Sequence, residues 1–468
     1  MAGFVPRGSW STPTRIRAGT VAAVALACCL AAVIVVVFGG LGGQFAAIGG
    51  RAAPEVDAAT GLYFAVNDMD AQVANILLAG DSVTLSADRS QDMVIYARDR
   101  STADQDLQQA TVTEAGDSAA EAGLRSVLDR LGQYEALAAD AILTDQAGGA
   151  GGRATAVSLA YYQQATDLMR TRILPEVNAL TTVSASSLDA GYQAGRATAE
   201  TGIVLVAVTG ALLLAVLVVL QLYLSARLRR IVNPALAAAT LIAVVLVAVT
   251  AAGLDAEAGH LKVAKQDAFD SILALTRARA ISYDANADES RYLVDPGRAA
   301  QYQQSFLTKS QQLADVGNVG ILGYDAALAT DIRAYSADNS DVAFGGYLGA
   351  EFRNITFTGE RAAAVRTLLA YQVYERDDRV LRALARQDQA AAVEFDTGTA
   401  RGQSDWAFNQ YDAALSSVIA INSGAFASAV AAGQGGAGNT DIAIYAAGAA
   451  LLAGLVIFGV RPRLAEYH

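Results

Sequence analysis

Residues 203–254 read IVLVAVTGALLLAVLVVLQLYLSARLRRIVNPALAAATLIAVVLVAVTAAGL. Two apolar segments, 203–224 and 235–254, flank a short basic segment at 225–234. A helix needs about 20 apolar residues to cross the hydrocarbon core of a bilayer, and both segments are long enough. This stretch therefore predicts two membrane-spanning helices joined by a tight turn.

Two further apolar segments lie near the ends of the chain, at residues 18–40 and 442–460. The first is longer than the apolar core of a secretory signal peptide, and no clear small-x-small cleavage site follows it, so we expect an uncleaved anchor. The chain's two cysteines, Cys28 and Cys29, lie inside this segment, which indicates buried thiols and no disulfide or zinc site. The sequence thus predicts four transmembrane helices.

The orientation of these helices follows from the position of the arginines. Eight arginines and a single acid, Glu466, occupy the three short hydrophilic segments of the chain. These segments are residues 1–17, 225–234 and 461–468. Because short cytoplasmic segments are enriched in Lys and Arg, we expect a multi-pass protein of the plasma membrane with both termini in the cytoplasm.

The remaining segments, residues 41–202 and 255–441, are long loops that we call the first and second loop, and each is long enough for its own core. Apolar residues recur at helical spacing in both, so we expect about four helices per loop, the number that closes an antiparallel bundle. In the first loop these residues are Leu62, Val66, Met69, Val73 and Ile76, then Leu124, Leu128 and Leu131. The predicted fold is an all-α membrane protein with two extracytoplasmic helical-bundle domains.

The order of span, bundle and span occurs twice, which indicates a tandem duplication. At one constant offset, three residues of the first loop match three of the second. The matched residues are Asp68, Ala71 and Leu77 with Asp284, Ala287 and Leu293. The two halves of the chain agree better in the order of their elements than in their individual residues.

Prolines and glycines predict which joints are stiff. No proline interrupts residues 235–294, so the third span can continue into the second loop as one helix of roughly 60 residues. Glycines cluster at 39–50 and 433–438, and we expect flexible joints there. Spans two and three are therefore the elements that we expect to relay movement.

Charge and composition exclude several functions. The net charge is −12, and the acid excess lies in the two loops, which argues against nucleic acid or anionic lipid as a partner outside the cell. His260 and His468 are the only histidines, so a catalytic triad or zinc centre is not expected. No phosphate-binding loop or kinase signature occurs. We expect no enzymatic activity, no metal and no cofactor.

Two arginine pairs are candidate contacts for an anionic ligand or a partner protein on the outer side: Arg98 with Arg100, and Arg277 with Arg279. The alternative is a solvated helix surface with weak local ion pairs. On the cytoplasmic side, the candidate contacts for an effector are Arg227, Arg229 and Arg230.

The order of spans and loops, with RLRRIVNP at 227–234 and YYQQATDLMRTRILP at 161–175, resembles the actinobacterial GlnX-type membrane proteins. The scarcity of lysine among the 34 basic residues and the abundance of alanine are likewise typical of a GC-rich actinobacterial genome. The resemblance implies signal relay between an extracytoplasmic lipoprotein that binds an amino acid of the glutamate, aspartate or glutamine type and a cytoplasmic Ser/Thr kinase. It implies no catalytic residues.

Three functions stay open at this point. The first is the relay just described. The second is a chemoreceptor-like sensor that binds a small ligand directly, which predicts a pocket at a bundle interface lined by convergent polar groups. The third is a scaffold or transporter accessory subunit. Transport itself is disfavoured, because no span contains an ionisable residue of the kind expected for an intramembrane ion or proton path. The partners expected are the bilayer and the two relay proteins, no nucleic acid is expected, and a homodimer stays open.

Overall fold

A computed structural model describes residues 12–113, 118–148, 153–228 and 233–465, and these residues are helical or in short turns, with no strand. Contacts divide the chain into two compact units. The membrane unit comprises Met1–Gly49, Asp189–Val263 and Ser428–His468. The loop unit comprises Gly50–Leu188 and Ala264–Ala427.

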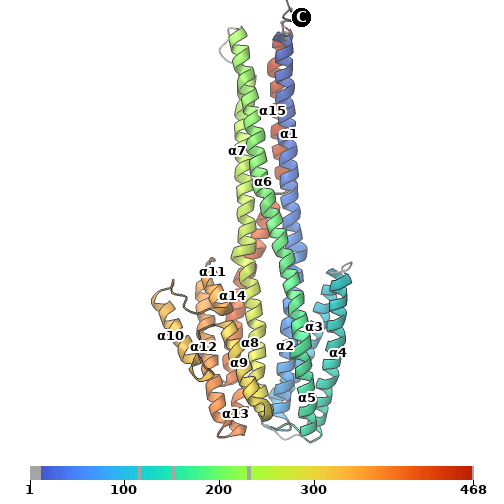
Figure 1. The fold of residues 1–468 in the computed structure, drawn as a ribbon. Coiled ribbons are helices and arrows are strands. Elements are labelled where there is room, and N and C mark those ends of the chain that lie inside the picture. Colours follow the sequence, from blue (N-terminus) through green and yellow to red (C-terminus); the bar gives the residue numbers. More distant parts are fainter. Residues whose placement is uncertain (1–11, 114–117, 149–152, 229–232, 466–468) are drawn as a thin grey trace, which may run out of the picture. The chain divides into compact units, whose positions relative to one another are not determined.

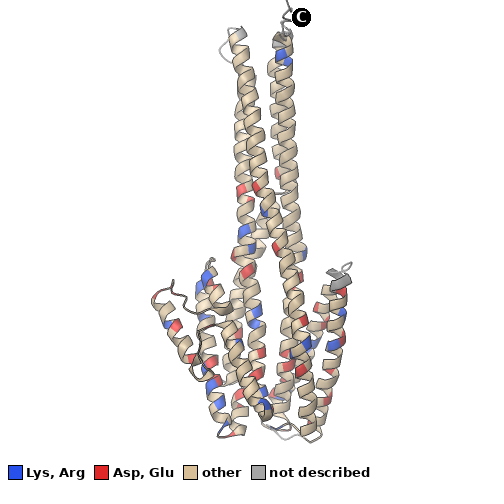
Figure 2. Cartoon of the chain, in the orientation of Figure 1, with Lys and Arg blue, Asp and Glu red and all other residues tan. Residues whose placement is uncertain are grey.

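Four helical runs are long and apolar enough to cross a membrane, and each contains one of the predicted spans. The runs are Thr12–Ala79, Ala156–Ala226, Pro234–Val294 and Ser404–Pro462. Their apolar stretches are free of charged side chains (Figure 2). The prediction of four membrane-crossing helices is therefore confirmed in length and composition.

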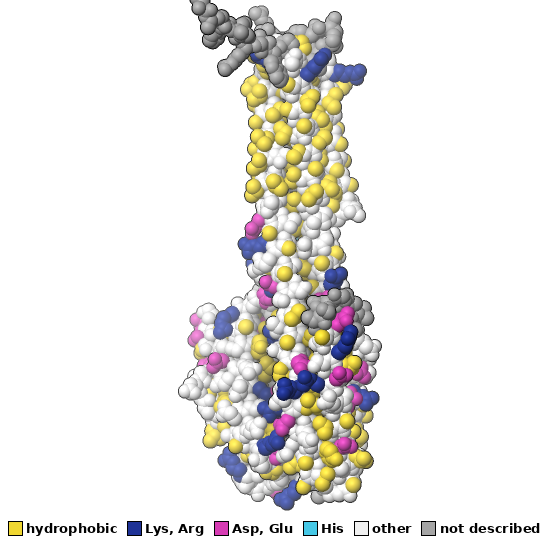
Figure 3. Space-filling model, turned by 45° about the vertical axis from the view of Figure 1, so that its right-hand side comes forward, with side chains coloured by type: hydrophobic (Ala, Val, Ile, Leu, Met, Phe, Trp, Pro, Cys, Tyr) yellow, Lys and Arg dark blue, Asp and Glu magenta, His cyan; other side chains and the backbone are white. Residues whose placement is uncertain are grey.

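The spans of the membrane unit have apolar surfaces. Each span exposes at least one large hydrophobic side chain over most of its area: Val36 (72%), Leu222 (65%), Leu241 (65%) and Phe458 (70%). Hydrophobic side chains gather around this part of the chain (Figure 3). A contiguous apolar surface of this kind is typical of lipid contact.

Within the membrane unit, α1 (Thr12–Ala47), α6 (Leu174–Leu228), α7 (Pro234–Lys262) and α15 (Asn439–Ala465) run side by side (Figure 1). Glycines permit the close approach of these helices. A Cβ added to Gly202 would lie 2.5 Å from the side chain of Val37, and one added to Gly210 would lie 2.4 Å from that of Val247. Small residues at helix interfaces are the usual means of close packing in membranes.

The prediction of flexible joints is wrong at the first glycine cluster, and at the second the helix is interrupted only at residues 437–438. α1 continues through Gly39 and Gly43, and the π-helix η1 (Ile48–Ala52) follows directly. α14 (Ser404–Gly436) contains most of the second cluster and ends in a short turn before α15. The physical reason is packing, because a Cβ at Gly433 would overlap the ring of Phe45, 2.2 Å away.

The prediction of one long helix after the third turn is confirmed. Residues Pro234–Val294 form an unbroken helical run of 61 residues. It consists of α7, the π-helix η3 (Val263–Phe269) and α8 (Asp270–Val294). Asn233 begins the run, because its side-chain oxygen accepts hydrogen bonds from the backbone N–H groups of Ala235 and Leu236.

The loop unit is built from shorter helices of both loops. The first loop provides α2 (Ala53–Ala79), α3 (Ser86–Thr113), α4 (Ser118–Gln146), α5 (Ala156–Leu168), the π-helix η2 (Met169–Ile173) and the beginning of α6. The second provides α8, η4 (Pro296–Arg298), α9 (Ala299–Leu313), α10 (Ile321–Ala337), α11 (Gly346–Asn354), α12 (Glu360–Ala385), α13 (Gln389–Asp396) and the beginning of α14.

The two loops share a hydrophobic core. The predicted stripe of the first loop is buried there, including Leu62, Val66, Met69 and Val73. Leu293 and Leu381 of the second loop belong to the same core. The contacts therefore group both loops in one unit, and two separate bundles are not shown. In α4 the predicted stripe is wrong at Leu128, which is exposed, because Val127 takes the inward position.

A buried ionic cluster joins α2 to α8. Arg291 of α8 is fully buried and donates to Asp70 of α2 at 2.5 Å, to Asp284 at 2.8 Å and to Asp288 at 2.7 Å. Lys309 of α9 also contacts Asp284, at 2.7 Å. Burial by itself would raise the pKa of Asp284, but Lys309 and Arg291 hold it below its ordinary value. The cluster fixes the pairing of the two helices that border the candidate site.

Candidate ligand-binding site

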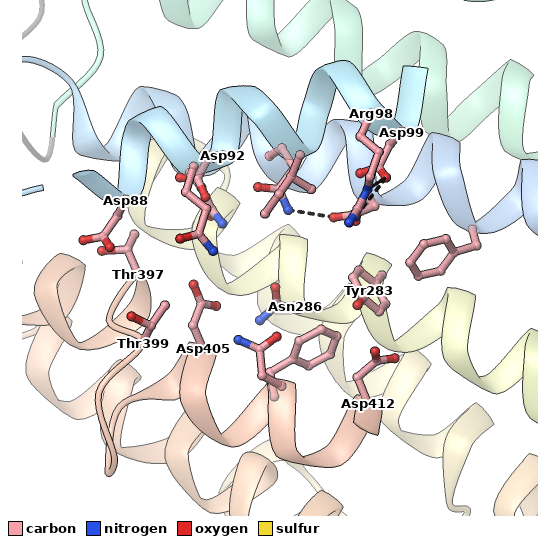
Figure 4. Close-up of a pocket in the computed structure, with 18 of the residues that line it drawn as sticks. Asp88, Asp92, Arg98, Asp99, Tyr283, Asn286, Thr397, Thr399, Asp405 and Asp412 are labelled. Atoms are coloured by element: carbon pink, nitrogen blue, oxygen red, sulfur yellow. Dashed lines mark hydrogen bonds and ion pairs between the residues drawn. The ribbon is translucent and has the colours of Figure 1, made fainter. Parts of the chain in front are cut away.

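A cavity of about 480 Å³ lies within the loop unit. It is bordered by α2 and α3 of the first loop, and by α8, α14 and the segment around Thr397 and Thr399 of the second loop (Figure 4). Its size is typical of a pocket for a small molecule. Both loops therefore contribute side chains to one site.

The lining is strongly acidic. It contains six aspartates and two arginines, and neither lysine nor histidine. The aspartates are Asp68, Asp88, Asp92, Asp99, Asp405 and Asp412. Fully ionised, these groups would leave an excess of four negative charges, so the site attracts cations.

Arg279 lines the cavity and is bonded to another lining residue, Asp412. Its Nε and Nη2 donate to the two carboxylate oxygens of Asp412 at 2.6 and 2.9 Å. Its guanidinium lies 4.3 Å from the ring centroid of Phe64 and 5.7 Å from that of Tyr283. Such a forked ion pair beside aromatic faces is a stable arrangement for arginine, so the charge of Arg279 is already compensated.

Arg98 is an exposed residue of the cavity lining, and it is paired with one of two adjoining buried carboxyl groups. Its Nη2 lies 3.2 Å from Oδ1 of Asp99, and the side chain of Arg98 is 66% exposed while that of Asp99 is 3% exposed. Asp68 of α2 adjoins Asp99 and accepts a hydrogen bond from Gln72 at 2.7 Å. Burial, together with the neighbouring Asp99, raises the pKa of Asp68 well above its ordinary value.

A second group of acids faces the cavity from α3 and α14. Burial raises the pKa of Asp92 to about 8, and Asp405 and Asp88 add to this effect. Burial also raises the pKa of Asp405 to about 7, against the hydrogen bond from Asn286. At neutral pH these carboxyl groups are partly protonated, because no cation compensates them.

Two lining side chains carry buried acceptor atoms that have no hydrogen-bond donor. They are Oδ2 of Asp99 and Oε1 of Gln72. The residues that line the cavity are all described, and none of them has a buried donor that lacks a partner. A buried polar atom without a partner is costly, so the cavity complements a ligand that donates hydrogen bonds.

The structure places the predicted outer arginines differently from one another. Arg98 and Arg279, from different loops, both line the cavity. Arg100 is exposed on α3 away from it, and Arg277 reaches Thr182 of α6 at 3.4 Å. The side chains of the predicted cytoplasmic contacts, Arg227, Arg229 and Arg230, lie outside the described residues.

The aspartates of the cavity were not among the predicted site residues. Asp68 carried a usable signal, since it lies inside the apolar stripe between Val66 and Met69 and has a match in Asp284. An ionisable residue within a buried helix face is a candidate functional group. Asp92 and Asp405 carried no such signal, because only the fold brings them to one cavity.

Comparison with known proteins adds an independent observation. The fold and the cavity define a helical membrane protein with a ligand-sized, acidic site in its loop unit. Residues 44–193 match the family model of the actinobacterial sensor domain, a range that includes the site helices α2 and α3. No curated protein and no solved structure matches the chain. The match supports a sensor-like actinobacterial protein.

Proposed function

We propose that this protein is a plasma-membrane sensor that binds a small ligand directly in the cavity of the loop unit, on the outer side of the membrane. The observation that carries the proposal is the cavity itself, because convergent polar side chains from both loops line it. This is the feature that distinguishes a direct sensor from a scaffold. The sensor-domain match to residues 44–193 supports the same reading.

The proposed signal passes along the chain through helices. α2, α8 and α14, which line the cavity, each belong to a helical run that also contains an apolar span. Packed helices shift between discrete arrangements more readily than they deform smoothly. A ligand that changes the spacing of these helices would therefore bias the arrangement of the spans.

The proposed output lies in the cytoplasm, with both termini and the 225–234 turn on that side. The proposed effector is a separate protein that contacts Arg227, Arg229 and Arg230 in this turn. The resemblance to GlnX-type proteins would make this effector a Ser/Thr kinase and would add an amino-acid-binding lipoprotein outside. Pull-down from native membranes tests this extension, since transporter subunits in place of these partners would favour an accessory role.

A tandem duplication would explain why both loops contribute to one site. The offset that relates Asp68 to Asp284 also places η1 within η3, and α1 and α2 then correspond to α7 and α8. The π-helices η1 and η3 thus each follow a span and precede a helix that lines the cavity. π-Helical segments are rare and occur often at functional positions, so their equivalent placement supports the duplication.

Ligand-induced stabilisation tests the sensor proposal. The full-length protein in lipid nanodiscs is screened by thermal unfolding against small amines, neutral polyols and carboxylates. Asn409→Trp fills the cavity, and Asn178→Trp places the same side chain on an exposed surface of α6 as the control. We expect at least one solute to raise the melting temperature of the wild type and of the control but not of the filled variant. No such solute in any class would overturn the proposal.

A further inference from the structure

We infer that the ligand of this cavity is an aliphatic amine with two or more ammonium groups, held between two pairs of carboxyl groups. The inference rests on the proposed sensor function and adds the chemical class of the ligand. It differs from the anionic ligand that the arginine pairs suggested, since Arg279 is neutralised by Asp412 and Arg98 is paired with Asp99.

The first carboxyl pair consists of Asp68 and Asp99. Both residues are almost fully buried, at 2% exposure each, and they adjoin each other. Arg98 reaches only Oδ1 of Asp99, and Gln72 reaches only Oδ1 of Asp68. Two adjoining buried carboxyl groups need either a shared proton or a cation between them. An ammonium group can supply both the charge and the donors.

The unpartnered acceptors point to the same class of ligand independently of the acidic charge. Both atoms line the cavity: Oε1 of Gln72 has no donor, and Oδ2 of Asp99 has none beyond the adjoining carboxyl group of Asp68. The amide orientation of Gln72 is set by the bond from its Nε2 to Asp68, so Oε1 is the free atom. An ammonium group has three N–H donors and no acceptor, which matches this set.

The second carboxyl pair consists of Asp92 of α3 and Asp405 of α14. These side chains approach from opposite sides of the cavity (Figure 4). Asp88 adds negative charge nearby, and Asn286 of α8 donates to Asp405. No arginine or lysine is bonded to either member of the pair among the described residues. Burial without a cation raises the pKa of both groups, which binding of a cation would reverse.

The separation of the two pairs sets the size of the ligand. Asp92 and Asp99 are seven residues apart on α3, about 10 Å along the helix at 1.5 Å per residue. A flexible aliphatic chain with an amino group at each end spans such a gap. Among the described residues no cluster of carboxylates, histidines and cysteines has the geometry of a metal site, so an organic cation fits better than a metal ion.

Aromatic side chains of the cavity also suit an aliphatic amine. Tyr283 packs edge-to-face against Phe64 at 4.5 Å and against Phe408 at 4.7 Å, and all three rings line the cavity. The methylene groups of an aliphatic chain gain contact with such faces, and cations next to them are stabilised. Arg279 already uses Phe64 in this way in the same cavity.

Isothermal titration calorimetry tests the inference. The probes are putrescine and spermidine, with 1,4-butanediol as the neutral and succinate as the anionic analogue of putrescine. The full-length protein is held in nanodiscs of phosphatidylcholine alone, so that amines do not bind anionic lipid. Binding of the amines, with proton release detected in two buffers of different ionisation enthalpy, is the expected result. Stronger binding of butanediol or succinate, binding of calcium chloride alone, or no binding of either amine would overturn it.

Variants locate the binding in the cavity. Asp99→Asn and Asp405→Asn each remove one carboxyl group, and we expect about tenfold weaker amine binding from each. Asp145→Asn is the matched control, because Asp145 is equally buried but lies on α4 outside the cavity. Equal affinities in all four proteins would overturn the inference. A neutral or anionic solute that stabilises the wild type but not Asn409→Trp would overturn the amine inference and leave the sensor proposal intact.

Discussion

Arg291 of α8 donates a 2.5 Å hydrogen bond to Asp70 of α2, 221 positions away in the chain, and neither side chain has any exposed surface. Asp70 also accepts a hydrogen bond from Thr166 at 2.5 Å, so helices of both loops meet at one carboxylate. Buried ion pairs specify how elements pair more than they add net stability. Here the pair aligns the two helices that border the candidate site.

Replacing Arg291 with methionine should destabilise the loop unit by about 3–5 kcal/mol, because the fully buried Asp70 would lose the cation bonded to it, while Asp284 and Asp288 would keep only Lys309. Denaturant unfolding in nanodiscs measures this loss. Arg125→Met is the control, since the side chain of Arg125 is 76% exposed and its pair with Glu121 is worth about 0.5 kcal/mol or less. Equal losses in the two variants would contradict the role of Arg291.

Stability should fall as pH rises from about 6 to 8.5 in the absence of ligand. Burial raises the pKa of Asp405 to about 7 and that of Asp92 to about 8, whereas unfolded aspartate titrates near 3.9. The folded state therefore holds more protons in this window, and its advantage is lost as pH passes the folded pKa values. Melting temperatures across the window measure the slope.

The double variant Asp92→Asn with Asp405→Asn should flatten this slope, because the amides do not titrate. Part of the slope should remain, because burial also raises the pKa of Glu375 to about 8 and that of Glu351 to about 7. Asp140→Asn, at an exposed position of α4, should leave the slope unchanged. A double variant with the wild-type slope would show that the two aspartates do not titrate as inferred.

Glycines in the membrane unit should differ sharply in their tolerance of alanine. Gly433→Ala should weaken the packing of α14 against α1, because the added Cβ would overlap the ring of Phe45. Gly43→Ala adds a Cβ that meets nothing within 4 Å, and it should stabilise α1 by up to about 1 kcal/mol. Thermal unfolding in nanodiscs measures the stability of each variant against the wild type. A destabilised Gly43→Ala protein would restore the flexible joint that the sequence suggested.

The sequence predicts that span two also relays movement, and α6 contacts the cavity helix α2 where Thr181 donates to the carbonyl oxygen of Ala59. Three consecutive glycines in place of Arg196, Ala197 and Thr198 should therefore weaken the coupling between ligand binding and the membrane unit. These residues lie inside the continuous helix α6, and each glycine costs about 1 kcal/mol of helix stability. The readout is the rate of disulfide formation between cysteines at Phe38 and Tyr445, whose rings are 5.2 Å apart, with Cys28 and Cys29 replaced by alanine.

In the wild-type background this crosslinking rate should change when a cavity ligand is added, and in the three-glycine variant the change should be smaller, because α1 and α15 keep their direct connection to the cavity helices α2 and α14. Arg196→Ala combined with Thr198→Ala is the control, since alanine preserves the helix. If the crosslinking rate of the three-glycine variant changes with ligand as much as that of the wild type, α6 does not take part in signalling.

Cysteine labelling tests the proposed topology. In a background with Cys28 and Cys29 replaced by alanine, Asp341→Cys lies on an exposed turn of the second loop and should react with a membrane-impermeant maleimide in intact cells. Arg461→Cys, exposed near the end of α15, should react only after permeabilisation. The reverse pattern would invert the orientation that the arginines predict.

Local patterns in the sequence were enough to predict the helical class, the four apolar spans and the long helix after Pro234. Span length and hydropathy depend on consecutive residues, and helical stripes such as Leu62, Val66 and Met69 depend on neighbours within two turns. The arginines of the cavity were also visible, because Arg98 and Arg279 stand out in an acidic chain poor in lysine.

Only the tertiary structure decided which residues share the candidate site and what charge the site has. Asp92 and Asp405 are 313 positions apart, and neither differs in its local sequence from a solvated aspartate. The glycines at 433–438 are typical of a flexible segment in the sequence, whereas in the structure the ring of Phe45 packs against Gly433. Burial and pairing between distant segments depend on packing, which local periodicity does not encode.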